Sequence, residues 1–254
     1  MYPSDQTVRM SAQAKPRTRL TLELCGRVLR SLDFKWLLAS PELSRQCWAM
    51  LSFLRDFFGG VRKGAAQDAI ASDDAMVDFI ATRAAHVCQT ALYGYLQKRM
   101  GTRSREIFQD PMFAEPLGVS REAMLVHCLS DLTIFAVAEA VAESGLDSAG
   151  LTDLAERWFR DAYRSVQAGV TDGDLSEAVR DLRDRASRTD WARAAEREGA
   201  FTASPQGLVD CAPVIDDLKD LDAEIVRNSV RFRWTDVRRQ FRERVDRAAF
   251  AGLR

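Results

Sequence analysis

The residues best suited to chemistry are His127 and Asp131, which lie within the longest apolar stretch of the chain. If this stretch is a helix, their spacing puts both side chains on one face, where they can touch. A carboxylate beside an imidazole in apolar surroundings raises the pKa of the histidine and fixes its tautomer, which is how a general base is oriented. We therefore predict His127 and Asp131 as catalytic candidates, and whether the protein is an enzyme stays open.

The same pair has a simpler interpretation, in which it is structural. The two side chains could satisfy each other inside the core, or Asp131 could pair with an arginine from a neighbouring helix. One helix face supplies neither a nucleophile nor oxyanion donors. The sequence also lacks a Walker A loop, a GxGxxG turn, a GxSxG elbow, an HExxH motif and an EF-hand loop. With two histidines in the chain, a multi-histidine metal site is excluded, and we predict neither a metal nor a cofactor.

A second candidate site lies over residues 93–103, where tyrosines, glycines and basic residues meet at the end of an expected helix. Arg99 and Arg103 could bind an anion, assisted by the hydroxyl groups of Tyr93 and Tyr95. The alternative is that the cations simply favour the negative end of the helix dipole. We predict these four residues as ligand-binding.

The C-terminal segment from Glu224 to Arg254 is the third candidate, because it holds nine arginines against four acidic residues. A basic amphipathic helix can contact an acidic partner, a nucleic acid or a membrane surface. Alternatively, its apolar stripe packs on the core and its arginines pair with the acidic region 139–224. The predicted partner-binding residues are Arg231, Arg233, Trp234, Arg238 and Phe241.

Helical periodicity recurs along the chain, and no sustained strand alternation appears. This pattern predicts an all-α fold, a single helical domain of about seven to nine helices around a buried central helix at about residues 120–143. The basic residues 1–17 are expected to form a flexible tail. The all-α domain is expected over residues 18–254, with room for a subdivision near 145–150.

Local signals mark the ends of several elements. Ser72-Asp73 and Gly101 are typical of a helix start and a helix stop. Residues 101–119 carry prolines and glycines without a strong apolar stripe, which indicates either a long loop or a short helix that the pattern does not reveal. A shift of the stripe near Asn228-Ser229 predicts a kink or break before the last helix ends at about Phe250. Further helices are expected at 20–32, 41–58, 151–168, 174–187 and around Trp191.

Composition narrows the class of protein. Hydrophobic residues make up 46% and charged residues 29% of the chain, and the net charge is −1, so no overall attraction to nucleic acid or membrane is expected. The five cysteines form no CxxC pair and are expected to be reduced. No secretory signal is visible, and charged side chains inside the long apolar run argue against a transmembrane segment. We predict a cytoplasmic protein.

These observations favour a helical protein-interaction module, such as an adaptor, an assembly factor or a scaffold, which binds a protein partner or itself. One alternative is an enzyme or small-ligand-binding protein that uses the His127 and Asp131 pair. The other is nucleic-acid binding through the arginine-rich C-terminal helix, which the near-neutral charge disfavours.

Overall fold

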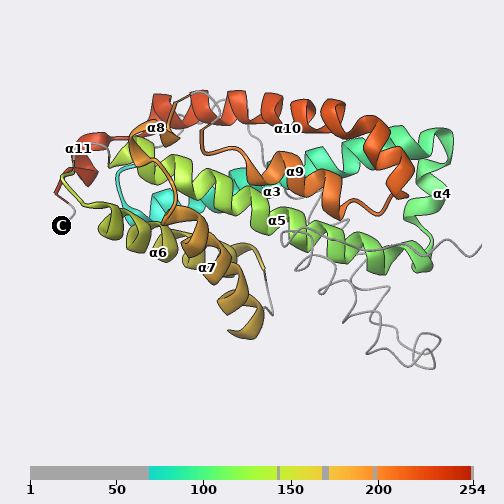
Figure 1. Ribbon diagram of the computed structural model, residues 1–254, viewed down its shortest axis with the longest axis horizontal. Helices are drawn as coiled ribbons and strands as arrows, with labels where there is room; N and C mark the ends of the chain where they lie inside the picture. The colour runs from blue at the N-terminus through green and yellow to red at the C-terminus, as the bar shows by residue number, and fades with distance from the viewer. Residues whose placement is uncertain (1–68, 142–143, 168–171, 197–198, 253–254) are drawn as a thin grey trace, which may run out of the picture. The chain divides into compact units, whose positions relative to one another are not determined.

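The computed structural model describes residues 69–141, 144–167, 172–196 and 199–252, which form helices joined by short connections and contain no named strand (Figure 1). These residues belong to one compact unit that begins at Ala66. The all-α prediction is confirmed for this part of the chain. The expected tail over residues 1–17 and the helices expected at 20–32 and 41–58 lie outside the described residues.

Two long helices, α3 (Asp73–Met100) and α5 (Pro111–Ala140), form the centre of the unit. Helix α3 begins after Ser72, whose hydroxyl accepts a hydrogen bond from the backbone N–H of Ala75 at 3.3 Å. It ends at Gly101, which has a φ of 57° that glycine adopts without strain. Both ends agree with the sequence prediction.

Of the two interpretations of residues 101–119, the structure shows the short helix and not the long loop. A 3-10 turn (Gly101–Arg103) and the short helix α4 (Ser104–Phe108) follow α3, and α5 begins only three residues after α4 ends. The structure therefore continues as helix through most of the region in which the apolar stripe is weak.

The two prolines of this region, Pro111 and Pro116, both lie within the first part of α5. The Asp110 carboxylate accepts a hydrogen bond from the Met112 N–H at 2.9 Å, and Pro111 occupies the first helical position, where its missing N–H is not needed. Pro116 lies further along this first part of α5, and its carbonyl accepts a hydrogen bond from the Ser120 hydroxyl at 2.8 Å. Only Leu117 and Ser120 are buried in residues 111–120, so the weak stripe reflects a helix start that is partly in contact with solvent.

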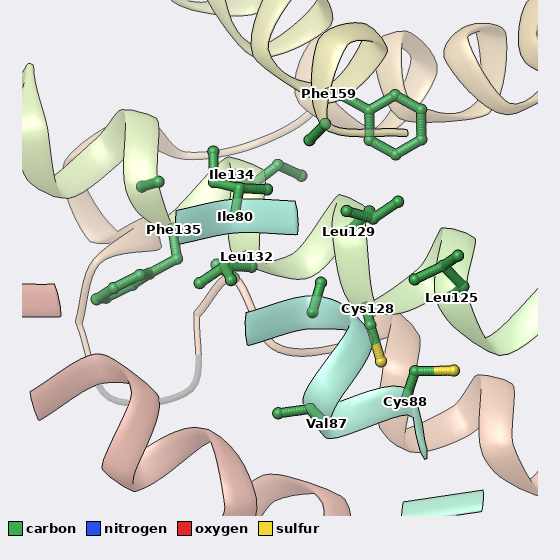
Figure 2. Close-up of a cluster of buried hydrophobic side chains, with 14 of the residues drawn as sticks. Ile80, Val87, Cys88, Leu125, Cys128, Leu129, Leu132, Ile134, Phe135 and Phe159 are labelled. Atoms are coloured by element: carbon green, nitrogen blue, oxygen red, sulfur yellow. The ribbon is translucent and has the colours of Figure 1, made fainter. Parts of the chain in front are cut away.

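The remainder of α5 forms the core, which confirms the predicted buried central helix. By length and composition α5 is the helix among the described residues that could cross a membrane, but 83% of its most apolar window is buried inside the protein. Figure 2 shows side chains from α3, α5 and α6 (Ser148–Val166) packed together in this core. They include Ile80, Val87, Cys88, Leu125, Cys128, Leu129, Leu132, Ile134, Phe135 and Phe159.

The other helices surround this pair (Figure 1). Helix α6 packs on α3, α5 and α7, while α9 lies between α5 and α10, and α10 also contacts α3. The short helix α8 packs on α5. Their bounds are α7 Asp172–Ala186, α8 Trp191–Ala194, α9 Ala203–Cys211, α10 Asp216–Arg244 and α11 Arg247–Phe250.

Of the kink or break predicted near Asn228-Ser229, the break does not occur, because α10 runs through both residues as one helix, which Figure 1 draws with a bend. Its two apolar stripes lie on opposite faces of one helix. The later stripe is buried (Val226, Val230, Trp234, Val237 and Phe241), whereas Leu221 and Ile225 of the earlier stripe are exposed. The shift in the sequence pattern therefore marks the change from an exposed to a buried apolar face within one helix.

The last helix does not extend to Phe250 as one piece. Helix α10 ends at Arg244, and the extended residue Val245 forms an isolated parallel bridge with Ile70. The Ile70 N–H donates to the Arg244 carbonyl at 2.8 Å, and the Asp246 N–H donates to the Ile70 carbonyl at 3.0 Å. This bridge joins the beginning and the end of the unit.

Candidate functional site

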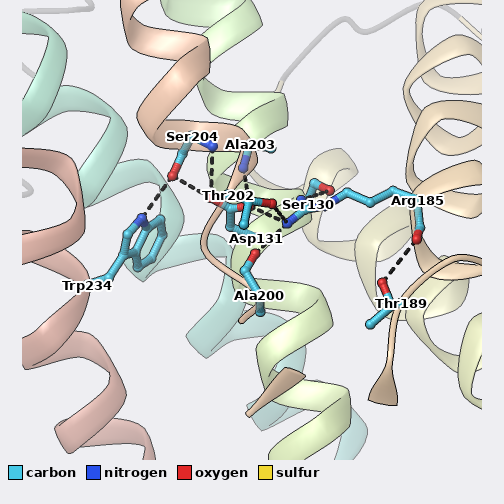
Figure 3. Close-up of polar contacts among 9 residues, drawn as sticks. All are labelled: Ser130, Asp131, Arg185, Thr189, Ala200, Thr202, Ala203, Ser204 and Trp234. Carbon is cyan, nitrogen blue, oxygen red and sulfur yellow. Dashed lines mark hydrogen bonds and ion pairs between the residues drawn. The ribbon is translucent and has the colours of Figure 1, made fainter. Parts of the chain in front are cut away.

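Asp131 is fully buried on α5 and binds the start of α9 (Figure 3). Its carboxylate accepts hydrogen bonds from the Ala203 N–H at 3.0 Å, the Ser204 N–H at 2.8 Å and the Ser204 hydroxyl at 2.5 Å. Thr202, which precedes α9, makes no capping hydrogen bond with its own side chain. Asp131 therefore caps α9 from another helix and places a negative charge at the positive end of its dipole.

Arg185 of α7 neutralises this buried carboxylate. Its Nη2 lies 2.6 Å from the Asp131 Oδ1, and its Nη1 donates to the Ser130 hydroxyl at 2.7 Å. The same guanidinium also donates to the Ala200 carbonyl and, at 3.2 Å, to the Thr202 hydroxyl. A buried aspartate paired with an arginine from a neighbouring helix is the structural alternative that the sequence left open.

The network extends to α10 through Ser204. The Trp234 indole N–H donates to the Ser204 hydroxyl at 2.9 Å, and that hydroxyl in turn donates to Asp131. Asp131, Arg185, Ser204 and Trp234, which we call the Asp131 junction, therefore join α5, α7, α9 and α10 (Figure 3). Both carboxylate oxygens already accept hydrogen bonds from the protein, which leaves Asp131 little capacity to take a proton from a substrate.

His127 lies one turn before Asp131, but the hydrogen bonds and the ion pair of that carboxylate go to α7 and α9. The imidazole instead packs over Gly207 of α9, where an added Cβ would lie within 3.0 Å of the ring atoms Cδ2, Cγ and Nε2. The sequence predicted a raised pKa for His127, and this is wrong. Burial lowers the pKa, and the opposing effects of Asp131 and Arg185 leave burial dominant.

Of the four residues predicted to bind a ligand, Tyr95 and Arg99 contact each other, while Tyr93 and Arg103 make contacts of their own. Arg99 forms an ion pair with Asp222 of α10, and Tyr95 shares a hydrogen bond with Arg99. The ring of Tyr93 lies 5.6 Å from that of Phe108 on α4. Arg103 pairs with Glu106 at 3.4 Å, and both side chains are exposed. The structure therefore divides these residues among different contacts.

The residues predicted to bind a partner separate into two groups. Trp234 and Phe241 are 1% and 0% exposed, so they belong to the core and not to a contact surface of the folded protein. Arg231, Arg233 and Arg238 are partly exposed on the flanks of α10. Arg231 donates to Asn228 at 3.0 Å, and the Arg238 guanidinium lies 5.6 Å from the centre of the Phe201 ring.

The earlier apolar stripe of α10 lies on the face that points away from the core, and sequence reasoning predicted neither its exposure nor its continuation to Phe232. Leu221, Ile225 and Phe232 are 74%, 72% and 80% exposed, and Leu218 is partly exposed. With Asn228, these residues follow alternating steps of three and four, which is the heptad spacing of a coiled-coil seam. We call Leu218, Leu221, Ile225, Asn228 and Phe232 the α10 seam. Testing the sequence for heptad spacing, in addition to a core-facing stripe, would have found it.

Among the described residues, no three histidine, cysteine, aspartate or glutamate side chains are grouped so that they could hold a metal ion. Cys88 and Cys128 are buried and reduced, and burial raises the pKa of both thiols. Comparison with known proteins gives no relative: no family model, curated protein or solved structure matches the chain.

Proposed function

We propose that the protein is a helical protein-interaction module, of the adaptor, assembly-factor or scaffold kind, and that it binds its partner through α10. The observation that carries this proposal is the α10 seam. Isolated exposed apolar residues are common on protein surfaces, but a row in heptad register is the pattern by which helices bind one another. Figure 1 shows α10 along one side of the described helices, with α9 and α3 on its inner side.

The energetics support binding through the seam. Complete burial of one large apolar side chain contributes about 1.5–3 kcal/mol. Leu221, Ile225 and Phe232 gain little of this in the folded chain, because each stays mostly exposed. A partner helix that covers all three would recover it. Asn228 in the same row would make the choice of partner and register more selective, since a polar group in a seam requires its own hydrogen bond.

The alternative functions have weaker support. Catalysis by His127 and Asp131 is disfavoured by the commitment of the carboxylate to Ala203, Ser204 and Arg185. Nucleic-acid binding through α10 is disfavoured because several of its arginines already pair with carboxylates. Arg239 pairs with Asp236 and Glu243, and Arg242 pairs with Glu139.

The proposal is tested by affinity capture from host extract with the full-length chain, its Ile225→Asp variant and its Met112→Asp variant. Met112 is 60% exposed at the start of α5, away from the seam, so it controls for replacing an exposed apolar residue with a charge. We expect the wild type and Met112→Asp to retain the same protein in near-stoichiometric amount, a second copy of the chain included. Ile225→Asp should lose it.

Nuclease treatment and urea unfolding complete this experiment. The partner should persist after nuclease treatment, and the variants should unfold at the same urea concentration as the wild type. Equal retention by Ile225→Asp would contradict binding through the seam, and loss of all bound protein after nuclease treatment would favour the nucleic-acid alternative.

A further inference from the structure

Helices α3 and α10 pack against each other in antiparallel orientation. The ring centres of Phe79 and Phe241 lie 5.3 Å apart, and a Cβ added at Gly94 would lie 3.3 Å from the Nη2 of Arg233. The residue numbers therefore rise along α3 while they fall along α10. Two rows of residues border this contact, and each row follows the three- and four-residue steps of one helix face. They are Arg83, His86, Thr90 and Gly94 on α3, and Arg233, Asp236, Gln240 and Arg244 on α10.

The charges in these rows are mainly positive. Three arginines and one histidine stand against one carboxylate, that of Asp236. This carboxylate accepts hydrogen bonds from Arg239 and, at 2.5 Å, from the side-chain amide of Gln240, so it is largely engaged within α10. A second carboxylate, Asp78, is exposed on α3 and attracts Arg83, as Asp236 does, without an ion pair among the described residues. A surplus of positive charge remains where the two helices meet.

At one end of the rows, two guanidinium groups share one aromatic ring. The guanidinium carbons of Arg83 and Arg244 lie 5.7 and 5.3 Å from the centre of the buried Phe79 ring. A ring face attracts each cation, but two cations at the same ring also repel each other. Burial, followed by the positive charge of Arg244, lowers the pKa of Arg83 accordingly. An anion beside both groups would relieve this repulsion.

At the other end, Arg233 lies against Gly94, where α3 has no side chain. The Nε atoms of Arg233 and Arg83 are both buried, and neither has a hydrogen-bond partner in the part of the chain that the structure describes. Burial lowers the pKa of Arg233, and no described carboxylate opposes this effect. A partly buried charge without a counter-ion destabilises the fold, so each of these two arginines would be stabilised by a bound anion.

His86 lies between these two ends on α3. Burial lowers its pKa, the positive charges of Arg83 and Arg233 lower it further, and Asp236 opposes them. Both arginines therefore act on the same imidazole, which places the two ends on one continuous surface. We call Arg83, His86, Arg233 and Arg244 the α3–α10 basic face. None of these residues belongs to the α10 seam.

We propose that the α3–α10 basic face binds a linear chain of phosphate groups, of the kind found in inorganic polyphosphate. Guanidinium groups bind phosphate oxygens through paired N–H donors. Arg83 and Gly94, beside which Arg233 lies, are eleven residues apart on α3, which is about 16 Å at the usual helical rise. A single phosphate cannot reach both ends of the face, whereas a chain of phosphates can. This site is separate from the proposed partner surface and goes beyond it.

The basic face favours phosphate groups alone over a nucleic acid. Proteins that bind single strands stack the bases on exposed aromatic rings. The two rows contain no aromatic side chain besides the imidazole of His86, and the Phe79 ring is buried beneath the guanidinium groups. The net charge of −1 also gives the chain no overall attraction to nucleic acid. We therefore expect the ligand to be recognised by its charge and its length.

Isothermal titration calorimetry of the full-length chain with medium-chain inorganic polyphosphate tests the proposal. The variants are Arg83→Gln and Arg233→Gln, and the control is Arg103→Gln, which removes one positive charge from an exposed side chain outside the face. We expect the wild type and Arg103→Gln to bind equally, and each of the other two variants to raise the dissociation constant about tenfold or more. Orthophosphate, which reaches one end only, should bind far more weakly.

Nuclear magnetic resonance of the wild type gives a readout that does not depend on those variants. The chain has two histidines, and the signal lost in His86→Gln identifies His86. Polyphosphate should raise the pKa of His86, because the anion offsets the positive charges of Arg83 and Arg233. The pKa of His127, which packs over α9, should not change.

The absence of saturable polyphosphate binding would overturn the site, and so would an equal loss in Arg103→Gln, since that indicates a general attraction between charges. A single-stranded oligonucleotide that binds more tightly than polyphosphate and depends on Arg83 would overturn it in favour of a nucleic acid. A pKa of His86 that stays unchanged at saturation would place the ligand elsewhere. None of these results affects the capture experiment with Ile225→Asp, so the proposed function is tested separately.

Discussion

Asp131 is a buried carboxylate whose hydrogen bonds and ion pair all go to neighbouring helices of the fold. A carboxylate that is buried away from water must form an ion pair and hydrogen bonds, because its desolvation otherwise destabilises the fold. The Asp131 junction meets this demand with two backbone N–H groups, one hydroxyl and one guanidinium. The residues that satisfy it come from α7 and α9, so the junction also holds these helices on α5.

The first prediction concerns removal of this carboxylate. Asp131→Ala leaves the Arg185 charge without its partner and the N-terminus of α9 uncapped, so we expect the free energy of unfolding to fall by about 3–5 kcal/mol. Urea unfolding measures this change. Asp236→Ala, which removes an exposed carboxylate from a pair within one helix, should change the stability little.

A second variant that regains part of the lost stability would support the structural role of the Asp131 carboxylate. Arg185→Met in the Asp131→Ala background removes the unpaired charge and should regain part of the lost stability. If Asp131→Ala were as stable as the wild type but lacked a biological activity of the protein, the carboxylate would be functional and the structural role would be rejected.

The second prediction concerns His127 and pH. Burial holds its pKa below the ordinary value of 6.5, so between the two values the unfolded chain binds a proton that the folded chain does not. The stability should therefore fall as the pH decreases below about 6.5. His127→Gln should show a smaller loss when urea unfolding is followed from neutral to mildly acidic pH.

His86 provides the comparison, because its pKa is also lowered. The main cause is burial, and the positive charges of Arg83 and Arg233 add to it. His86→Gln should reduce the acid sensitivity by its own share, and the double variant should reduce it further. An unchanged acid sensitivity in His127→Gln would mean that this imidazole is not held neutral by burial.

At the scale of the elements, α9 approaches α5 closely because Gly207 lacks a side chain where the His127 ring passes. We predict that Gly207→Ala destabilises the fold by about 1–3 kcal/mol, as overpacking in a core does. Gly118→Ala is the matched control in α5: a Cβ there meets no atom within 4 Å, so better helix propensity should leave the protein as stable or more stable.

Thermal unfolding of a double-mutant cycle tests the cause. In the His127→Ala background the ring is absent, and Gly207→Ala should then destabilise much less. If the losses of stability in the two single variants simply added in the double variant, the destabilisation by Gly207→Ala would not arise from contact with the His127 ring.

The elements that sequence alone predicted well are those with local signals. Ser72 and Gly101 delimit α3 because a capping hydroxyl and a left-handed glycine act within one turn. The start of α5 was missed because Pro116 suggests a loop, and its compatibility with an exposed helix end depends on tertiary context. The exposure of the earlier stripe of α10 was not predicted because periodicity records which residues share a face, not whether that face is covered.

The candidate site was predictable only as a pair of residues on one helix. That Asp131 and His127 share α5 follows from their spacing, but their partners are Arg185, Ser204 and Gly207, which are distant in the sequence. No local pattern indicates that a carboxylate on one helix caps another. Nor can a single sequence show that Trp234, in a row of arginines, turns inward to hydrogen-bond Ser204.

At the scale of the whole described unit, the C-terminal segment closes the structure. The bridge between Ile70 and Val245 is reinforced by Glu139 of α5, whose side chain pairs with Arg242 at 2.9 Å and with Arg247. Just beyond, Phe250 is buried and its ring centre lies 5.8 Å from that of Trp158 on α6. The last residues therefore connect α5, α6 and the start of the unit.

The final prediction concerns this closure and separates it from the surface of α10. Phe250→Ala should lower the free energy of unfolding by about 3 kcal/mol, because it removes a buried ring against Trp158 and leaves a cavity. Phe232→Ala truncates the same residue type where it is 80% exposed, so it should leave the stability of the folded chain nearly unchanged when measured at low protein concentration. The two variants should thus differ in urea midpoint, and Phe232→Ala alone should weaken binding of a partner through the α10 seam. Equal stability of both variants would mean that the segment after Arg244 is not required for the fold, and the helices would then be held by their own core.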